Sequence, residues 1–188
     1  MIIKSNHPEC LKQSIQVIKA GGIAILPCDT IYGLVGLAPY ADSRLRQIKG
    51  RSEDKPFLIL IKDISWLKEF SPLSLPAALK PFWPGPLTII FPGYQGEKIG
   101  LRIPSDPFLQ NLLTALNHPI YSTSVNLAGE PPLNEIAKII QGFAAKVDLI
   151  VDTGDLGGRQ ASTIIDISEK PYRLIRQGAV EIPPALLS

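Results

Sequence analysis

Two hydrophobic periods alternate along the chain, and this alternation limits the fold more than any other sequence feature. Amphipathic segments, in which apolar residues recur every three or four positions, are typical of helices; short apolar runs are typical of strands. The segments expected to be helical are 8–20, 107–116, 133–145, one that Asp42 caps and that runs to Lys49, and one that begins with Asp63 or Ser65 as its cap. The runs expected to be strands are 23–26, 57–61, 88–91, 99–103, 120–124, 149–152, 163–167 and 172–176. The pattern predicts an α/β fold around a mostly mixed sheet.

Length and composition are those of a globular chain. The 188 residues predict a single domain over 1–188, and a domain of this size buries about 70% of its unfolded surface. Apolar residues make up 45% and charged residues 19%, which excludes a disordered or fibrous chain. The 19 basic and 17 acidic residues nearly balance, so any nucleic-acid binding would have to come from a local patch.

The cysteines and the apolar runs indicate a cytoplasmic protein without a membrane role. Cys10 and Cys28 have no metal-binding or redox spacing, so a reducing cytosol is expected. The first eight residues lack the apolar core of a signal peptide, and no run approaches the ~20 apolar residues of a spanning helix. His7 and His118 both precede proline, and we interpret them as turn residues rather than catalytic groups.

A compact basic cluster lies where a predicted helix ends and a strand begins. It comprises Lys49-Gly50-Arg51 and Lys55-Pro56, so three cations fall within seven residues. Their mutual repulsion would be relieved by a bound anion, and phosphate is the commonest multivalent one. The alternative is that all three are solvated loop charges, as Lys and Arg usually are.

Polar side chains gather at two strand ends, where α/β sheets commonly form sites. Thr30 and Tyr32 follow the first predicted strand, and the alternative there is an ordinary turn. Ser122 and Ser124 share one face at the end of the 120–124 strand. This Ser/Thr/Asn stretch could bind a phosphate or carboxylate, or could be a polar turn. A nucleophilic serine is the weaker idea, because the chain has no G-x-S-x-G elbow.

Three further segments complete the candidate site. Residues 83–88, Trp-Pro-Gly-Pro-Leu-Thr, are rigid and are expected to fix the entry to the next strand. The glycine-rich segment 154–163 is either a mobile loop over a site or a loose surface loop. Arg176 adds a cation at the end of the last strand. The chain has neither a P-loop nor a G-x-G-x-x-G motif, so ATP would be bound by scattered cations and hydroxyls.

Seven motifs in order resemble those of the YrdC/TsaC family, in its short, single-domain bacterial form. The resemblance runs nearly end to end, and each motif alone is weak. The motifs are GIAILP with DTIYGL in 22–34, KGR with KP in 49–56, WPGPLT in 83–88, RIP in 102–104, STSVNLAG in 122–129, STIID in 162–166 and RQG in 176–178. The chain departs from the family's pattern at Cys28, Leu60, Ala128 and Ala161.

The resemblance implies a fold and a reaction. The fold is a YrdC-like twisted sheet with flanking helices and a basic concave face. The reaction is that of a threonylcarbamoyl-AMP synthase, a nucleotidyltransferase that converts L-threonine, bicarbonate (or CO2) and ATP into threonylcarbamoyl-AMP and pyrophosphate. The implied partners are downstream proteins that transfer the group to the adenosine beside the tRNA anticodon, with a contact to tRNA itself. Mg²⁺ would arrive with the nucleotide, and the protein would provide no metal site of its own.

The resemblance also implies roles for individual residues. The catalytic tetrad would be Lys49, Arg51, Ser124 and Asn126. ATP would contact these four together with Lys55 and Arg176. Threonine would be held by Thr30, Arg102, Ser122 and Ser162, and Tyr32 would shape the pocket.

Two other classes of protein remain open. An RNA-binding module of the same fold, without synthase activity, would use the basic face for a backbone, although the chain has only 7% aromatic residues and no stacking motif. A carbamoyl-transfer domain like that of hydrogenase-maturation proteins would belong to a long chain with zinc-finger-like cysteines, which this sequence lacks.

Overall fold

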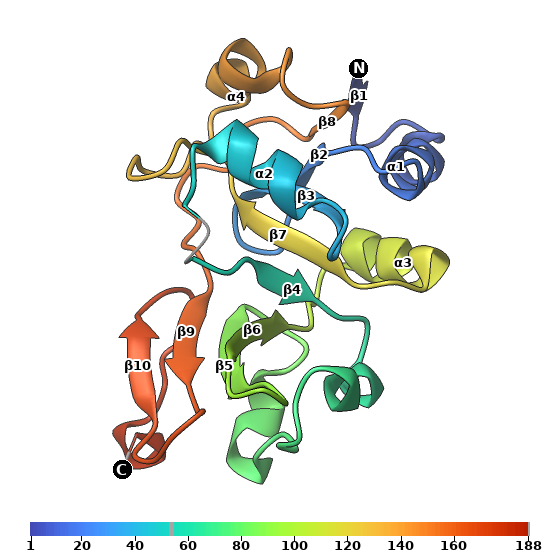
Figure 1. The fold of residues 1–188 in the computed structure, drawn as a ribbon. Helices are drawn as coiled ribbons and strands as arrows, with labels where there is room; N and C mark the ends of the chain where they lie inside the picture. The colour runs from blue at the N-terminus through green and yellow to red at the C-terminus, as the bar shows by residue number, and fades with distance from the viewer. Residues whose placement is uncertain (53–54, 188) are drawn as a thin grey trace.

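One ten-stranded mixed sheet runs through the molecule, which is described by a computed structural model over residues 1–52 and 55–187. The strand order is β1-β8-β2-β3-β7-β4-β6-β5-β9-β10 (Figure 1). The strands are β1 (Ile2–Lys4), β2 (Ala24–Pro27), β3 (Tyr32–Leu37), β4 (Leu58–Leu60), β5 (Leu87–Pro92), β6 (Lys98–Arg102), β7 (Ile120–Ser124), β8 (Leu149–Asp152), β9 (Thr163–Asp166) and β10 (Arg173–Arg176). Parallel and antiparallel pairs are interspersed, so the predicted α/β fold with a mixed sheet is confirmed.

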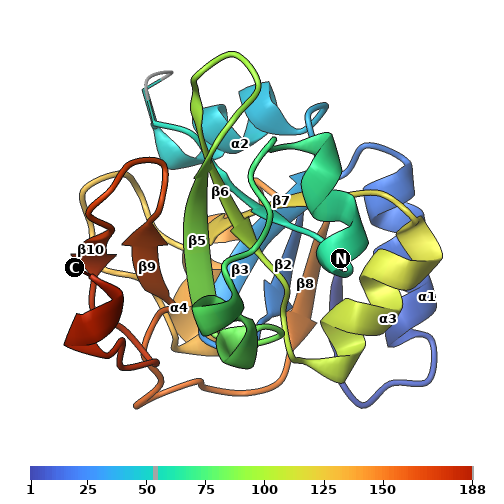
Figure 2. The ribbon, with the colours of Figure 1, turned by 90° about the horizontal axis from the view of Figure 1, so that it is seen from below.

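The helices cover the two faces of the sheet unequally. The α-helices are α1 (Cys10–Lys19), α2 (Asp42–Lys49), α3 (Pro107–Leu116) and α4 (Ile136–Phe143), and the 3₁₀ helices are η1 (Ile64–Glu69), η2 (Ala77–Phe82) and η3 (Pro184–Leu186). Helices α1 and α3 lie side by side and pack on one face, over a cluster that includes Ala24, Val35 and Ile120 (Figure 2). Helices α2 and α4 pack on the other face, against Ile25, Leu34 and Ile150.

Alternation along the strands shows which part of the sheet the helices leave uncovered. In β4, β5, β6 and β9, one set of side chains points into a core with η1 and η2, and this set includes Ile59, Ile89, Leu101 and Ile165. Because successive side chains point to opposite faces, the residues between them lie on the side where α1 and α3 pack further along the sheet. No α-helix among the described residues covers this half of that face, and the site described below occupies it.

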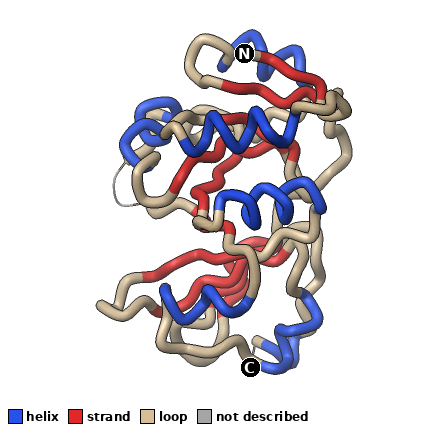
Figure 3. Tube along the Cα trace, turned by 90° about the vertical axis from the view of Figure 1, so that its right-hand side faces the viewer, coloured by secondary structure: helices blue, strands red, loops and turns tan. Residues whose placement is uncertain are grey.

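Most predicted elements match the structure, and α3, β7 and β8 match at both ends. The basic cluster lies where it was predicted, between α2 and β4. Gly50, which follows α2, has φ +61°, a left-handed conformation that glycine adopts without strain. The chain ends lie at opposite ends of the molecule (Figure 3). Within the described residues, none of the helices is long and apolar enough to cross a bilayer.

Several details of the prediction were wrong or incomplete. The strands β1 and β3 were not predicted; β3 contains two glycines, which are rare in strands, and its pairing with both β2 and β7 outweighs that preference. Asp42 does not cap α2 with its side chain; it is the first helical residue and binds Arg46. The helix predicted over 133–145 spans only 136–143, because the backbone of Leu133 pairs with Val125 instead.

Candidate functional site

A cavity of about 280 Å³ opens on the uncovered half of the sheet. Its wall is formed by side chains from β3, β4, β5, β6, β7, β9 and β10 and from the segments that precede β3, β4 and β9. Four of its described lining residues are cations, namely Arg51, Lys98, Arg102 and Arg176. The residues with hydroxyl groups among those that line it are Thr30, Tyr32, Thr88, Ser122, Thr123, Ser124 and Ser162. Among the described residues that line it there is no Asp or Glu, so the cavity suits a polar, negatively charged ligand.

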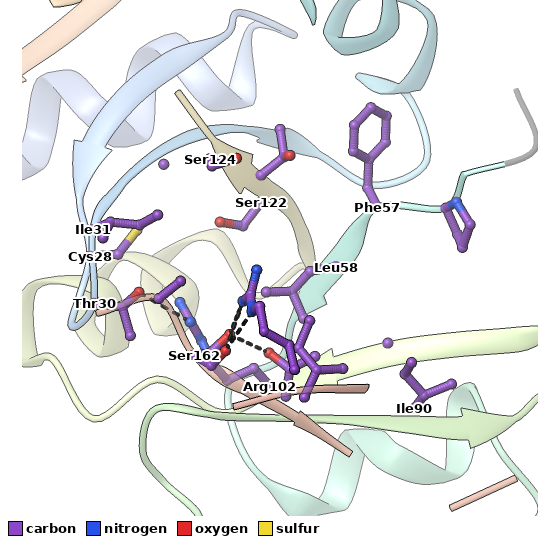
Figure 4. A pocket seen from close by; sticks show the side chains of 18 of the residues that line it. Cys28, Thr30, Ile31, Phe57, Leu58, Ile90, Arg102, Ser122, Ser124 and Ser162 are labelled. Atoms are coloured by element: carbon purple, nitrogen blue, oxygen red, sulfur yellow. Dashed lines mark hydrogen bonds between the residues drawn. The ribbon is translucent and has the colours of Figure 1, made fainter. Parts of the chain in front are cut away.

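Strand register brings these side chains together from distant parts of the chain. Ser122 and Ser124 lie on one face of β7, as their spacing predicted, and Arg102 lies on β6 two strands away. In the close-up, Thr30, Ser122, Ser162 and Arg102 surround one common space (Figure 4). The expectation that polar residues from separate segments converge is therefore met by these residues.

Arg102 is a cation buried in the cavity wall, with only 3% of its surface exposed. Its Nη2 lies 3.1 Å from Oδ1 of Asp29, and its Nη1 donates to Oγ1 of Thr30 at 3.4 Å. The contact with Asp29 is an ion pair without hydrogen-bond geometry, and among the described residues the Nε of Arg102 has no hydrogen-bond partner. Arg102 lines the cavity, so its guanidinium can bind an acceptor there.

Ser162 is held from two sides at the far wall. Arg176 donates to the Ser162 carbonyl from Nη2 at 2.7 Å and from Nε at 3.1 Å, and to its Oγ from Nη2 at 3.2 Å. The hydroxyls of Ser162 and Thr88 lie 2.9 Å apart. The position of Ser162 therefore depends on β10, which carries Arg176.

Lys49 lies directly behind the Ser124 wall and does not line the cavity. Its Nζ donates to the carbonyl of Ser124 at 2.7 Å, the carbonyl of Asn126 at 3.0 Å and Oδ1 of Asn126 at 2.6 Å. Only 3% of Lys49 is exposed. Burial, and secondarily the charge of Arg51, lower the pKa of Lys49 to about 8.

Asn126 and Ser124 complete this buried network. The Ser124 hydroxyl donates to Oδ1 of Asn126 at 2.6 Å, and the Asn126 amide donates to the carbonyl of Glu130. Ser124 lines the cavity, whereas Asn126 lies behind it with Lys49. Three of the four residues of the predicted tetrad thus form one hydrogen-bonded unit at the edge of the cavity.

Arg51, the fourth member, lines the cavity from another segment. Its Nε donates to the carbonyl of Lys55 at 3.1 Å and its Nη2 to the carbonyl of Pro56 at 2.9 Å. The guanidinium carbon lies 5.0 Å from the centre of the Phe57 ring, within cation–π range. Lys55 itself is exposed and does not line the cavity; the contact that it makes here is through its carbonyl.

Tyr32 closes one side of the site and fixes the loop beside it. Its ring is fully buried, and its hydroxyl donates to the carbonyl of Gly154 at 2.7 Å and accepts from the amide of Thr153 at 3.0 Å. Burial raises the pKa of this phenol. Two further contacts attach the segment 154–163: Leu156 is buried, and the carboxylate of Asp155 accepts a hydrogen bond from the amide of Ile136. The segment is therefore neither a loose surface loop nor a detached lid.

Sequence reasoning did not assign Lys98 or Thr88 to the cavity, although both line it. The missing signal for Lys98 was the strand period: residues 98, 100 and 102 share one face, and the strand was expected to begin only at residue 99. Within the described residues no group of three or more His, Cys, Asp or Glu could hold a metal ion. Both cysteines are free and buried, and burial raises the pKa of Cys28 to about 12, which keeps it a thiol.

The open sheet and its cationic cavity define an α/β protein with a cavity, formed by several strands, that is suited to an anionic ligand. The chain belongs to the Sua5/YciO/YrdC family, whose model, described as telomere recombination, matches residues 16–178. This agrees with the family predicted from the sequence motifs and with its fold.

The chain is also similar to individual curated proteins and solved structures. The chain is 28% identical to the threonylcarbamoyl-AMP synthase of Pyrococcus abyssi over 88% of its own length and 53% of that protein, and 27% identical to the Bacillus subtilis enzyme of the same name over 95% and 56%. It therefore spans about half the length of these relatives. The structure resembles E. coli YciO (TM-score 0.85, 27% identity, 98% of this chain and 96% of that one) and P. abyssi Sua5 complexed with L-threonine (0.83, 26%, 95% and 57%).

Proposed function

We propose that the protein is a threonylcarbamoyl-AMP synthase. The observation that carries the proposal is the cavity itself, in which cations and hydroxyls converge without a carboxylate among the described lining residues. ATP, bicarbonate and the threonine carboxylate are all anionic, and such a cavity can hold them together. The curated relatives with this name, and the P. abyssi structure that contains L-threonine, support the same reaction.

The reaction proceeds in two balanced steps. The amine of L-threonine and bicarbonate form a carbamate and release water. A carbamate oxygen then attacks the α-phosphorus of ATP, the bond between the α-phosphorus and the bridging oxygen breaks, and pyrophosphate leaves. Neither step needs a covalent nucleophile from the protein, so positioning and charge stabilisation provide the catalysis.

The threonine end of the proposed site lies around Arg102. Its guanidinium lines the cavity and would bind the threonine carboxylate. Thr30, Ser122 and Ser162 present hydroxyls to the same space and would bind the amino and hydroxyl groups of the substrate.

The nucleotide end lies around Ser124 and Arg51. Arg51 would contact the phosphates and Ser124 the adenylate, while Lys49 and Asn126 would hold Ser124 in place and supply a positive charge behind it. Arg176 would contact the phosphates only after breaking its hydrogen bonds to Ser162. Lys55 would approach them from outside the cavity. Mg²⁺ would be carried by the nucleotide and neutralise part of its charge.

The biological setting belongs to the same proposal. The product would pass to proteins that modify tRNA, in the cytoplasm, and tRNA itself would meet the basic face. We also propose that residues 1–188 act as one domain, which the continuous sheet from Ile2 to Arg176 supports.

Pyrophosphate release from ATP tests the proposed function. We expect release only when threonine and bicarbonate are both present. Equal release without threonine would show that the substrate is wrong. Salt-sensitive RNA binding without any synthesis would instead favour the RNA-binding module. Lys49→Met and Arg51→Ala should each lower the rate by about 10²-fold, because both support charge that develops on the phosphates; full activity in both would contradict the mechanism.

A further inference from the structure

Lys98 is a cavity residue to which the proposed reaction has so far given no role. It is the first residue of β6 and lies on the same face as Gly100 and Arg102, and all three line the cavity. Its side chain is 50% exposed, so it lies at the mouth of the cavity, whereas Arg102 is buried at the far end of the same strand. Four residues of extended strand separate the two cations by about 13 Å.

The register groups the four cations of the cavity into two pairs. Thr88 of β5 pairs with Ile164 of β9, and Ile164 pairs with Arg176 of β10. Ser162 links this end further, because its hydroxyl contacts both Arg176 and Thr88. This is the end of the cavity that contains Arg102. Lys98 lies at the opposite end, where Pro56 and Phe57 line the cavity just before β4, the parallel neighbour of β6.

Arg51 occupies this same end. Its guanidinium donates to the carbonyl of Pro56 and packs on the ring of Phe57. The cavity therefore carries one cationic pair at each end, Arg102 with Arg176 and Arg51 with Lys98. A ligand with negative charge at both ends fits this arrangement, such as an amino-acid carboxylate placed beside a nucleoside triphosphate.

The ammonium of Lys98 is held at the wall by one partner. Its Nζ lies 2.8 Å from Oδ2 of Asp166, and among the described residues this is its only hydrogen bond, although an ammonium has three donors. Asp166 is fixed in turn, because its Oδ1 accepts from the amide of Ser168 at 2.9 Å and from its hydroxyl at 2.6 Å. The side chain of Asp166 is only 7% exposed, so the flexible partner in this pair is the lysine.

We propose that Lys98 binds the terminal phosphates of the substrate, and later the leaving pyrophosphate, and that Asp166 holds the lysine at the wall until the ligand arrives. This inference rests on the proposed function, because it takes ATP as the ligand. A triphosphate has enough charge to compete with a single carboxylate for a half-exposed ammonium, whereas AMP ends too early to reach it. Asp166 thus competes with the triphosphate for the ammonium of Lys98, whereas Lys98 stabilises the bound triphosphate.

Calorimetry with two probes tests this assignment. The probes are AMP and α,β-methylene-ATP, which cannot release pyrophosphate, and they are titrated into the full chain carrying Lys98→Gln, Asp166→Asn or Lys80→Gln. Lys80 is an exposed lysine of η2 that does not line the cavity, so it provides the matched control. For K98Q we expect the affinity for α,β-methylene-ATP to fall by about five- to tenfold, with AMP affinity within twofold of wild type.

The Asp166 variant separates binding from a purely structural role. D166N should increase the affinity for α,β-methylene-ATP, because the competing carboxylate is gone. If the ion pair between Lys98 and Asp166 were purely structural, K98Q and D166N would both bind α,β-methylene-ATP more weakly. The inference would be wrong if K98Q lost affinity for AMP and for α,β-methylene-ATP equally, or if its affinity for α,β-methylene-ATP were unchanged. Neither result would contradict the proposed function as long as the wild-type protein still makes threonylcarbamoyl-AMP. A wild-type chain that binds no α,β-methylene-ATP would overturn the proposed function and this inference together. If D166N does not fold, the two-probe comparison in K98Q decides alone.

Discussion

Oδ1 of Asn126 accepts two hydrogen bonds at once, from the ammonium of Lys49 at 2.6 Å and from the hydroxyl of Ser124 at 2.6 Å. One amide oxygen thereby links a lysine on α2 to a serine at the end of β7. Lys49 also binds two carbonyls, and none of the described residues gives its buried charge a carboxylate partner, so the cavity gains a positive potential just behind its wall. The titration of Lys49 should therefore be visible in ligand binding.

Raising the pH above about 8 should weaken nucleotide binding. Lys49 has a pKa of about 8, so its ammonium loses its charge above that value, while the phosphates stay ionised. We expect the affinity for α,β-methylene-ATP, measured by calorimetry between pH 7.5 and 9.5, to fall by up to about tenfold per pH unit above 8. Lys49→Met should bind more weakly throughout and show no such dependence; the same slope in K49M would assign the titration to another group.

The same pKa predicts how stability depends on pH. Between about pH 8 and the ordinary lysine pKa of 10.5, the unfolded chain keeps the proton on Lys49 and the folded chain does not. The unfolded state then binds more protons, so the contribution of Lys49 to the free energy of unfolding rises as the pH increases through this window. Urea denaturation at pH 7.5 and 9.5 measures the change, and its difference between wild type and K49M isolates the lysine.

Arg102→Lys should impair threonine more than ATP. The substitution keeps the charge but loses the planar fork and the Nε donor that the described residues leave unpaired. Steady-state kinetics should show the KM for threonine raised by about tenfold or more, with the KM for ATP within about twofold. Arg173→Lys, on exposed β10, provides the control and should change neither. Equal increases in both KM values for R102K would place Arg102 outside the threonine end.

Gly178→Ala should disturb the site from outside the cavity. A Cβ at residue 178 would lie 2.2 Å from the carbonyl oxygen of Ala161 and 2.6 Å from the carbonyl carbon of Ser162, so the backbone must move. We expect a lower melting temperature and raised KM values, because Ser162 and Arg176 shift together. At Gly157 a Cβ would meet nothing within 4 Å, so Gly157→Ala should leave both unchanged. Wild-type behaviour of G178A would mean that this contact relaxes freely.

Tyr32→Phe should destabilise the protein and loosen the neighbouring loop. The variant leaves the amide of Thr153 and the carbonyl of Gly154 without the hydroxyl that each contacts. Denaturation should show a loss of about 1–3 kcal/mol, and amide exchange should quicken around residues 153–160. Tyr94→Phe removes an exposed hydroxyl that donates to Lys68 and should cost far less. If Y32F and Y94F cost the same, the hydroxyl of Tyr32 does not anchor the loop.

The sequence predicted the elements whose periodicity is strong. Helix α3 has four buried leucines at helical spacing, so its extent from 107 to 116 could be predicted. Strand β3 was missed because its glycines weaken the local signal, and only pairing with β2 and β7 establishes it. The motifs also indicated which segments meet, since Ser122, Ser162 and Arg102 do line one cavity.

The sequence could not predict which site residues lie on the cavity surface and which lie behind it. Lys49 and Arg51 are two residues apart, yet one lies buried behind a wall and the other on the cavity surface. The difference arises because α2 ends between them, which turns the following backbone toward Pro56. Whether a cation has an internal partner, as Lys98 has in Asp166, likewise depends on strand order rather than on chain order.

The uncovered half of the sheet has a consequence for synthesis of the protein on the ribosome. Its lining takes residues from β3, an early strand, to β10, the last described strand, and β9 pairs with β5 on one side and with β10 on the other. A nascent chain can therefore build its N-terminal helices and strands early, but the cavity wall lacks Ser162 and Arg176 until the β9 and β10 segments have been synthesised. Ligand contacts that involve these two residues can stabilise the protein only after that point.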